Sequence, residues 1–482
     1  MRMPRDIGPF HIVGIGGIGM SAIAEVMHDR GYVVRGSDLK AGGNVKRLQA
    51  KGIDCLIGHN AGNIDGAGFV VLSSAIRPGN PEYDAALERG IPVIRRAAML
   101  AELMRECEAV SVTGTHGKTT TTSLIAELLD TAKLDPTVIS GGIIENWRSN
   151  ARIGEGDWMV VEADESDGTF TMLPTRIGVV TNIDPEHMDF WHSLEALHGA
   201  FKAFFDNIPF YGVVIAGLDH PIVREMIAAL RREESGNRVL TYGVADDADL
   251  RLANYRVEAG VGAFDAELGA KVPGGARVLE GLRLPMPGEY NALNALAALA
   301  VALEIGIPDD RIRATLAAFG GVNRRFTLTG SWNGVSIYDD YAHHPVEIAA
   351  VLKAARGATD GKVIAIVQPH RYTRLKNLFG DFCTCFSDAD AVIVTPVYSA
   401  GEKPIDGIDR DALIEGLKRQ GRDNVLPSDG ADGLAATVAQ LAQPGDLVIG
   451  MGAGTITDWA HALPDELERL KPGLKPTGGE PS

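Results

Sequence analysis

Twice in the first third of the chain, an apolar run leads into a glycine-rich turn and then into a helical pattern. The first turn, GIGGIG at 14–19, follows Phe10–Val13, and the second, GTHGKTT at 114–120, follows Ala109–Thr113. A glycine-rich turn between a parallel strand and a helix lets backbone N–H groups approach phosphate oxygens at the N-terminus of the helix. The pattern therefore predicts an α/β fold with two nucleotide-binding units in succession.

Further apolar runs divide the chain into three α/β domains, which we expect at residues 1–105, 106–322 and 323–470, followed by a disordered tail at 471–482. Glycine-rich alternating segments at 236–285 favour an antiparallel subregion, and Asn291–Leu303 has the composition of a helix. The remaining expected strands are Tyr32–Val34, Val70–Ser74, Ile91–Arg95, Trp158–Glu162, Gly178–Asn182, Ser336–Asp340, Val363–Gln368, Ala391–Pro396 and Leu447–Gly450.

The charge and the apolar patterning of the chain indicate which partners it binds and where in the cell it lies. A formal net charge of −17 without a basic stripe argues against nucleic acid. No apolar run reaches the ~18 residues that a membrane span needs, and the N-terminus lacks a signal-peptide core, so we expect a cytoplasmic protein. Four cysteines do not make a disulfide framework, and the pair Cys383 and Cys385 has no second pair to complete a zinc site.

The second glycine turn has the chemistry of a P-loop for ATP. Its residues Gly114, Thr115, His116, Gly117, Lys118, Thr119 and Thr120 are expected to surround the phosphates. Lys118 would reach the β- and γ-phosphates, and the Thr119 hydroxyl would ligate Mg²⁺. The usual pattern has another glycine at position 112, where this chain has Val112, so the loop is a shortened variant.

Two later strands are expected to end in metal-binding or substrate-orienting side chains. Glu162 opens the segment EADESD, and His187 lies in NIDPEHMD after the next strand. In a P-loop fold, an acidic residue at such a strand end supplies metal ligation beside the P-loop threonine. We therefore expect Thr119, Glu162 and His187 to form the metal site, although a lone histidine such as His187 is often structural.

The first glycine turn, taken alone, fits a dinucleotide fingerprint. Gly16, Gly17 and Gly19 follow a strand, and Asp38 lies nineteen residues beyond Gly19. This pattern indicates that a diphosphate binds the first domain, but not which nucleotide carries it. An NAD-dependent oxidoreductase remains open at this point.

Arginines and histidines follow two strands of the third block. One segment is DDYAHHP at 339–345, and the other is QPHRYTR at 368–374, which contains Arg371 and Arg374. Arginines three apart face one pocket when the segment is helical, and their forked donors suit a carboxylate or phosphate. Arg324 and Arg325 at the block boundary are candidates to contact ATP phosphates.

Together, the motifs GIGGIGMSAIAEV, GTHGKTTTT, EADESDGTF, TNIDPEHMD, DDYAHHP and QPHRYTR resemble the Mur ligase family in the family's order, over roughly residues 9–465. The resemblance implies an N-terminal Rossmann-like domain for a UDP-sugar, a central P-loop domain for ATP, and a C-terminal Rossmann-like domain that admits an amino acid. The similarity is greatest to the branch that joins L-alanine to the lactyl carboxylate of UDP-N-acetylmuramate, in peptidoglycan precursor synthesis. This implies ATP, two Mg²⁺ ions and an acyl-phosphate intermediate. For the assembly we expect a monomer or weak homodimer.

The resemblance also assigns roles to individual residues. Ser73, Ser74 and Arg95 would join Gly16, Gly17, Gly19 and Asp38 at the sugar nucleotide. Asn291, and less clearly Asn294, would contact adenine, Arg325 the ATP phosphates and Asp340 the ribose. Catalytic roles would fall to Lys118, Glu162, His187, His343 and Arg371, and the incoming alanine would be surrounded by Tyr341, His343, Arg371 and Arg374.

The chain departs from the family pattern at three places. Tyr290 stands where a histidine is common, Ala342 replaces a frequent glycine, and the loop around Trp147 lacks the usual small residues. Lys202 follows His187 at the spacing of a carbamylated lysine in other branches, but we expect an ordinary lysine. The alternatives are a recycling ligase that adds a preformed tripeptide, and a nucleotide-binding regulator without catalysis.

Overall fold

The computed structural model describes residues 3–4, 6–73, 75–232 and 236–470, apart from the side chain of Asp189. By their contacts the residues divide into two compact units. The first comprises Met1–Asn254, Phe264–Arg283 and Leu293–Val322, and the second Tyr255–Ala263, Leu284–Ala292 and Asn323–Ser482. Three sheets run through them, as expected of a three-domain α/β protein. Ser74 and the tail 471–482 lie outside the described residues.

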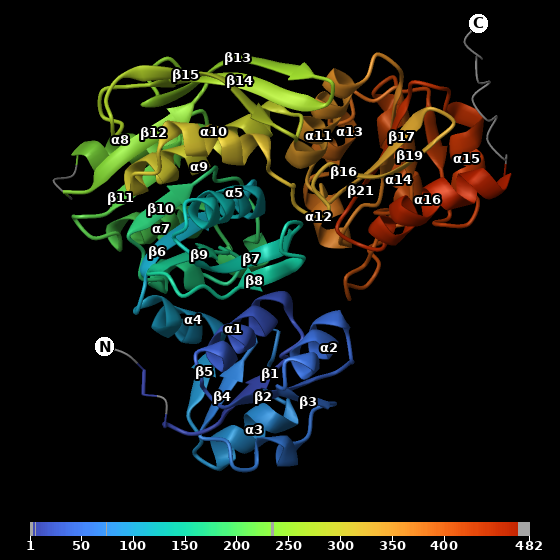
Figure 1. Ribbon diagram of the computed structural model, residues 1–482. Helices are drawn as coiled ribbons and strands as arrows, with labels where there is room; N and C mark the ends of the chain where they lie inside the picture. The colour runs from blue at the N-terminus through green and yellow to red at the C-terminus, as the bar shows by residue number, and fades with distance from the viewer. Residues whose placement is uncertain (1–2, 5, 74, 233–235, 471–482) are drawn as a thin grey trace, which may run out of the picture. The chain divides into compact units, whose positions relative to one another are not determined.

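The first sheet is parallel and has the order β3-β2-β1-β4-β5 (Figure 1). Its central strand β1 is buried throughout. Three of its side chains are apolar, and the fourth, His11, is hydrogen-bonded to Glu82. The strands are β1 Phe10–Val13, β2 Val34–Asp38, β3 Asp54–Ile57, β4 Phe69–Leu72 and β5 Val93–Arg95, and the helices are α1 Ile18–Asp29, α2 Gly43–Ala50, α3 Pro81–Glu88 and α4 Arg96–Met104.

The second sheet has the order β15-β14-β13-β12-β11-β10-β6-β9-β7-β8. Its strands are β6 Glu108–Thr113, β7 Thr137–Ile144, β8 Ser149–Arg152, β9 Trp158–Glu162, β10 Ile177–Val180, β11 Val213–Gly217, β12 Arg238–Gly243, β13 Leu250–Glu258, β14 Val261–Leu268 and β15 Arg277–Leu284. The accompanying helices are α5 Lys118–Thr131, α6 Met188–Trp191, α7 Leu194–Asp206, α8 Pro221–Arg232, α9 Glu289–Ile305 and α10 Asp309–Ala317.

The third sheet has the order β16-β17-β21-β18-β19-β20; β16 and β17 pair antiparallel, and the other neighbouring strands pair in parallel. Its strands are β16 Thr327–Trp332, β17 Val335–Asp340, β18 Val363–Val367, β19 Ala391–Val394, β20 Val425–Pro427 and β21 Leu447–Met451. Its helices are α11 Pro345–Ala358, α12 Tyr372–Asn377, α13 Phe379–Thr384, α14 Arg410–Arg419, α15 Leu434–Leu441 and α16 Ile456–Leu470.

The α/β prediction is confirmed, and both glycine turns lie between a parallel strand and a helix as expected. Two expectations are wrong. The strand expected at Tyr32–Val34 begins only at Val34 and runs to Asp38 as β2. The antiparallel subregion was predicted to begin at 236, but β12 pairs in parallel with β11 over Val213↔Arg238 to Gly217↔Tyr242. The second half of β12, residues 240–243, is fully buried and belongs to the parallel core, although the short, alternating, glycine-rich pattern favoured antiparallel pairing.

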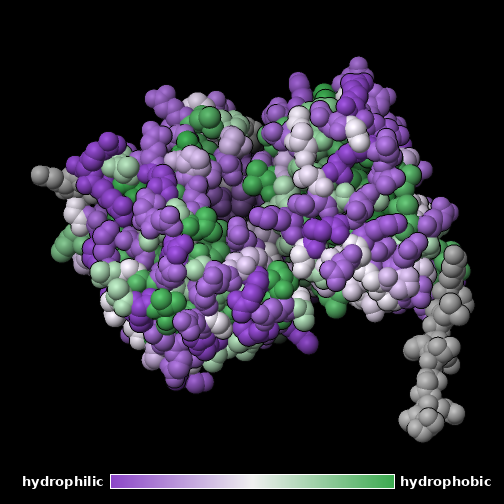
Figure 2. Space-filling model, turned by 90° about the horizontal axis from the view of Figure 1, so that it is seen from above, coloured by the Kyte–Doolittle hydropathy of each residue, from purple (hydrophilic) through white to green (hydrophobic). Residues whose placement is uncertain are grey.

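On the face drawn in Figure 2, hydrophobic residues form small separate groups among hydrophilic ones. Among the described residues, none of the helices combines the length and apolarity required to cross a bilayer.

Candidate functional site

The first glycine loop is braced by Asp38, which ends the neighbouring strand β2. The Gly16 N–H donates to Asp38 Oδ2 at 2.8 Å, and Asn44 Nδ2 donates to the Gly16 carbonyl at 2.9 Å. A Cβ on Gly16 would lie 2.9 Å from Asp38 Oδ2 and 2.8 Å from a Val45 methyl. Position 16 therefore requires glycine because the Asp38 side chain approaches its backbone closely.

The other predicted sugar-nucleotide residues lie at the same edge of the first sheet, since all its strands run in parallel. Gly17 precedes α1, and Gly19 lies within it. Ser73 follows β4, and its N–H donates to the Val13 carbonyl at 3.2 Å. Arg95 ends β5, is exposed, and stacks its guanidinium 5.7 Å from the Tyr83 ring centre.

The P-loop is shaped by a residue from the next strand end. Gly114 and Gly117 have φ values of +122° and +83°, which only glycine adopts readily. The Thr115 N–H donates to the Asn182 carbonyl at 3.0 Å, and the His116 N–H to Asn182 Oδ1 at 2.7 Å. Asn182 therefore holds the loop open in front of α5, whose first turn directs N–H groups at the loop.

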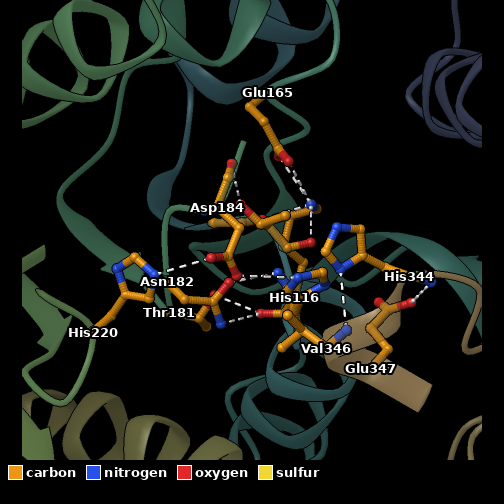
Figure 3. A network of polar contacts seen from close by, with 12 residues as sticks. His116, Glu165, Thr181, Asn182, Asp184, His220, His344, Val346 and Glu347 are labelled. Carbon is orange, nitrogen blue, oxygen red and sulfur yellow. Dashed lines mark hydrogen bonds and ion pairs between the residues drawn. The ribbon is translucent and has the colours of Figure 1, made fainter. Parts of the chain in front are cut away.

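Asp184 forms a second link between the same two strand ends (Figure 3). Its carboxylate pairs with His116 Nε2 and with His220 Nε2, each at 3.2 Å. Burial alone raises the pKa of Asp184, but the two histidines outweigh burial and lower it well below the usual range. Asp184 therefore stays ionised and fixes the orientation of the His116 ring.

Lys118 is paired with Glu165, which lies after β9. Lys118 Nζ lies 2.9 and 3.1 Å from the two Glu165 oxygens, and it donates to the carbonyls of Gly114 at 2.6 Å and Thr115 at 3.1 Å. Burial alone lowers the pKa of Lys118, but the nearby carboxylates outweigh it and hold the pKa above its usual value. The lysine is thus a permanent cation at the mouth of the P-loop.

Glu162 and Thr119 lie side by side, as predicted. Thr119 Oγ1 donates to Glu162 Oε1 at 3.1 Å, and the Gly141 N–H donates to Glu162 Oε2 at 2.6 Å. Burial raises the pKa of Glu162, although the Lys118 charge acts in the opposite direction. A carboxylate and a hydroxyl at this spacing are the hard oxygen ligands that Mg²⁺ prefers.

His187 lies near a different pair of carboxylates. Ligand atoms of Asp164, Glu165 and His187 all lie within 4.8 Å of one another, and His187 Nε2 is 3.9 Å from Glu165 Oε1. His187 has a φ of +55°, a left-handed backbone that is uncommon outside glycine and often occurs at functional sites. Two potential cation-binding groups, Thr119 with Glu162 and Asp164 with Glu165 and His187, therefore lie near Lys118.

The sequence analysis missed three residues of this region. It quoted the EADESD segment but selected only Glu162, whereas Asp164 and Glu165 also reach the site. Asn182 was placed at a polar strand end where a ligand would lie, but it was given no role. All three residues lie two or three positions after a parallel strand of the sheet, and such positions line the ligand edge.

The two asparagines expected at adenine differ in their surroundings. Asn294 Oδ1 accepts from Thr121 Oγ1 at 3.3 Å, and a Cβ on Gly117 would lie 2.4 Å from it. Asn291 lies in the second unit, where its Nδ2 donates to the Pro287 carbonyl at 2.8 Å. Its Oδ1 is buried and has no hydrogen-bond partner among the described residues, so Asn291 offers an unused acceptor.

Asp340 is buried and Tyr290 is partly buried in the second unit. Asp340 accepts N–H groups from Phe326 and Ala342, both at 2.7 Å, and burial raises its pKa to about 6. Burial also raises the pKa of Tyr290, and the nearby Asp340 charge adds to this effect. With both oxygens accepting backbone N–H groups, Asp340 has a clear structural role in shaping the 324–326 turn.

Tyr341 and His343 lie beside two arginines. The guanidinium of Arg324 lies 4.7 Å and that of Arg325 5.2 Å from the Tyr341 ring centre. His343 Nδ1 lies 2.9 Å from the Tyr341 carbonyl. A carbonyl only accepts, so the neutral His343 ring carries its proton on Nδ1, and Nε2 is the basic nitrogen. The next residue, His344, caps α11 instead by accepting the Val346 N–H (Figure 3).

Arg371 and Arg374 differ in their hydrogen-bond surroundings and are not two equivalent guanidinium groups. Arg374 Nη1 donates to His370 Nδ1 at 3.1 Å. Arg371 precedes α12 with a φ of +69°, and its Nε is buried without a hydrogen-bond partner among the described residues. Arg371 thus offers an unused donor.

His370 is a further residue that the sequence analysis did not select. Its ring stacks on Tyr398, with ring centres 5.5 Å apart and planes inclined by 10°, and lies 5.6 Å from the His343 ring. Burial lowers the pKa of His370 to about 3, with the neighbouring charges of His343, Arg374 and Arg371 contributing. His370 is therefore neutral at physiological pH.

Lys202 and Trp147, which the sequence analysis singled out, each have a partner close by in the sequence. Lys202 lies on α7 with half its side chain exposed and pairs with Asp206 at 3.4 Å. Trp147 lies in the turn between β7 and β8, where the Arg152 guanidinium is 5.2 Å from its ring centre.

Comparison with known proteins assigns the whole chain to one family. Residues 9–107 match a model described as "Mur ligase family, catalytic domain", residues 112–302 the "Mur ligase middle domain", and residues 324–454 the "Mur ligase, glutamate ligase domain". A protein named UDP-N-acetylmuramate–L-alanine ligase from Parvibaculum lavamentivorans is 59% identical over 467 residues, covering 97% of this chain and 94% of the relative.

A relative of the same name from Methylorubrum populi is 57% identical, covering 98% of this chain and 100% of its own. Among solved structures, the UDP-N-acetylmuramate–alanine ligase of Thermotoga maritima aligns with a TM-score of 0.79 at 27% identity, covering 96% of this chain and 100% of that chain. A murein peptide ligase from Psychrobacter arcticus shares the fold, with a TM-score of 0.66 at 22% identity over 95% and 98% of the two chains. With all three family models matched in order and near-complete coverage at this identity, the chain belongs to the Mur ligase family.

Proposed function

We propose that this chain is an ATP-dependent ligase that joins L-alanine to the lactyl carboxylate of UDP-N-acetylmuramate, giving ADP and phosphate, in the cytoplasm. The observation that carries the proposal is 59% identity over 97% of the chain to a relative named for this reaction. We assign residues 1–105 to the sugar nucleotide, 106–322 to ATP and 323–470 to the amino acid, in a monomer or weak homodimer.

In this proposal ATP binds at the P-loop, between α5 and the strand-end carboxylates. Lys118 contacts the β- and γ-phosphates after exchanging contacts with Glu165, and Thr115, His116, Gly117 and Thr120 surround them. Asn291 receives the adenine amino group on its unused, buried Oδ1. Arg325 contacts the phosphates and Asp340 the ribose.

The residues around Lys118 also fit Mg²⁺. Thr119 with Glu162, and Asp164 with Glu165 and His187, bring hard oxygen donors and one imidazole to two adjacent places. Bound there, Mg²⁺ would neutralise charge on the transferred phosphoryl group.

The first step activates a poor acyl donor. The lactyl carboxylate oxygen attacks the γ-phosphorus of ATP, and the bond to the ADP oxygen breaks, which gives an acyl phosphate. Little covalent work is needed from the protein in such a transfer, so positioning and charge stabilisation dominate. Lys118, fixed as a cation by its surroundings, supplies that charge.

The second step forms the amide bond. The amine of L-alanine attacks the acyl carbon, and phosphate leaves from the tetrahedral intermediate as the amine gives up a proton. His343 Nε2 is the candidate acceptor for that proton, since Nδ1 faces a carbonyl. Arg371 holds the alanine carboxylate with its unused Nε donor. Arg374 and Tyr341 also surround the alanine, and Arg374 orients the neutral ring of His370.

The sugar nucleotide binds at the edge of the first sheet. Gly17 and Gly19 let its diphosphate approach the N-terminus of α1, while Ser73, Ser74 and Arg95 contact the nucleotide. Asp38 supports the site by holding the Gly16 N–H. This replaces the direct ribose contact that a dinucleotide fingerprint implies for such an acidic residue.

Phosphate release tests the proposal against its rivals. With ATP, Mg²⁺ and UDP-N-acetylmuramate, L-alanine should stimulate release strongly, and a preformed tripeptide should not. A preference for the tripeptide would indicate the recycling ligase instead. Oxidation of NADH without phosphate release would indicate an oxidoreductase, and ATP binding without any stimulated release would indicate a regulator.

A further inference from the structure

One segment of the first unit touches both proposed nucleotide sites. Strands β7 and β8 form an antiparallel hairpin, residues 137–152, with Ile139 opposite Ala151 and Ile144 opposite Ser149. The hairpin packs against α1 on one side and α5 on the other (Figure 1). Its turn is the Trp147 loop, which departs from the family pattern and to which the proposed reaction gives no role.

On the ATP side, the hairpin contacts the P-loop helix and its acidic partner. The Gly141 N–H donates to Glu162 Oε2 at 2.6 Å, and a Cβ on Gly142 would lie 2.8 Å from the Thr119 methyl. Farther along, Asn146 Nδ2 donates to Glu127 Oε1 in α5 at 2.9 Å. The position of the hairpin is therefore set by the two residues proposed to bind metal and by the helix that follows the P-loop.

On the sugar-nucleotide side, one asparagine makes the connection. Asn150 Nδ2 donates at 3.0 Å to the carbonyl of Ile18, the first residue of α1, and Asn150 Oδ1 accepts from Arg47 Nη2 of α2 at 2.9 Å. Only 2% of Asn150 is exposed. Its amide thus binds the helix that follows the first glycine loop and the helix that packs beside it.

These contacts restrict independent movement of the two loops. Asn150 and Glu127 are buried, so separating either from its partner would leave a polar group without water or protein to satisfy it. Strands β7 and β8 are hydrogen-bonded to each other, and β7 is also hydrogen-bonded to β9. A displacement of α1 on binding at the first loop is therefore passed to α5 and Glu162, rather than absorbed between them.

We propose that the 137–152 hairpin couples ligand binding at the first glycine loop to ligand binding at the P-loop, with Asn146 and Asn150 as positioning residues. The inference rests on the proposed function, which supplies the two ligands. Coupling between sites commonly changes affinity by about 5- to 150-fold and is reciprocal. An ATP analogue should therefore tighten UDP-N-acetylmuramate binding at least about fivefold, and the reverse should hold equally.

Calorimetric titration of the full-length chain measures this coupling directly. The dissociation constant of UDP-N-acetylmuramate is determined with Mg²⁺, with and without a saturating non-hydrolysable ATP analogue, and the ratio is the coupling factor. Asn150→Ala and Asn146→Ala break different contacts at opposite ends of the hairpin. In each, the factor should fall to within about twofold of one.

Ser149→Ala is the matched control. Its hydroxyl accepts the Ala151 N–H at 3.2 Å within the hairpin and, within the part of the chain that the structure describes, makes no hydrogen bond to α1 or α5, so this variant should keep the wild-type factor. Should Asn150→Ala unfold, Arg47→Ala removes one of the same two bonds and should lower the factor partway.

The possible results distinguish a failure of the coupling from a failure of the proposed function. A wild-type factor in either asparagine variant, an equal loss in Ser149→Ala, or a factor of one in the wild type with both ligands bound would overturn the coupling alone. Failure of the wild type to bind either ligand would overturn the proposed function, and the coupling with it.

Discussion

Replacing Glu127 by glutamine should stabilise the first unit at alkaline pH and change it little near pH 5. Glu127 lies in α5, is 5% exposed, and accepts a hydrogen bond from Asn146. Burial raises the pKa of its carboxyl from 4.5 to about 7, and Asp130 acts in the same direction. Glutamine keeps the size and an oxygen for Asn146 but removes the charge.

The magnitude follows from the two pKa values. A carboxyl with a higher pKa in the folded chain contributes stability that is fully present below pH 4.5 and is lost as the pH rises through about 7. The difference corresponds to about 3 kcal/mol at ~1.4 kcal/mol per pKa unit. Because glutamine does not titrate, Glu127→Gln should gain up to about that amount over the wild type between about pH 5 and about pH 9.

Scanning calorimetry at several pH values measures the effect. For a unit of about 300 residues, about 3 kcal/mol corresponds to a rise in Tm of roughly 5 °C relative to the wild type at alkaline pH. Glu225→Gln, at an exposed position of α8, is the control and should show no such pH dependence. A Tm difference that is the same at about pH 5 and about pH 9, or that Glu225→Gln reproduces, would refute the reasoning.

Three substitutions test the proposed sites. Lys118→Ala should lower kcat more than about tenfold, which corresponds to a barrier increase above ~1.4 kcal/mol. The double variant Lys118→Ala/Glu165→Gln is the control for the carboxylate that Lys118→Ala leaves unpaired, and it should be equally inactive in phosphate release. Gly16→Ala should raise the KM for UDP-N-acetylmuramate while the Kd for ATP stays near wild type, because its Cβ would displace Asp38; loss of ATP affinity instead would mean that the two nucleotide sites are exchanged. Arg371→Ala should raise the KM for alanine without changing sugar-nucleotide binding, and an unchanged alanine KM would place the acceptor elsewhere.

Much of the fold was accessible from the sequence because its signals are local. A glycine turn between an apolar strand and a helix is visible in consecutive residues, as at Gly114–Thr120, and the structure has that arrangement. The strand-end rule likewise predicts Glu162 beside Thr119, and the two side chains are hydrogen-bonded in the structure. The error at β12 arose because pairing direction depends on a distant partner strand, which a local pattern does not specify.

Side-chain partners were harder to predict for the same reason. Among the four acidic residues of EADESD, Glu165 reaches Lys118 only because of the path the chain takes after β9. The hold of Asn182 on the P-loop joins residues 66 positions apart. Arg371 has a left-handed backbone directly before α12, which sets its surroundings apart from those of Arg374 and for which the sequence carries no signal.

The central claim is that the lactyl carboxylate of the sugar nucleotide attacks ATP to give an acyl phosphate. The amine of alanine then attacks the acyl carbon, and phosphate leaves. The direct measurement uses UDP-N-acetylmuramate with heavy oxygen in its lactyl carboxylate, together with ATP, Mg²⁺ and L-alanine, and mass spectrometry of the products. The account predicts an alanyl amide of the sugar nucleotide, with one heavy oxygen atom transferred to each phosphate released. Amide formed alongside phosphate without the label would contradict it, as would phosphate release without any amide.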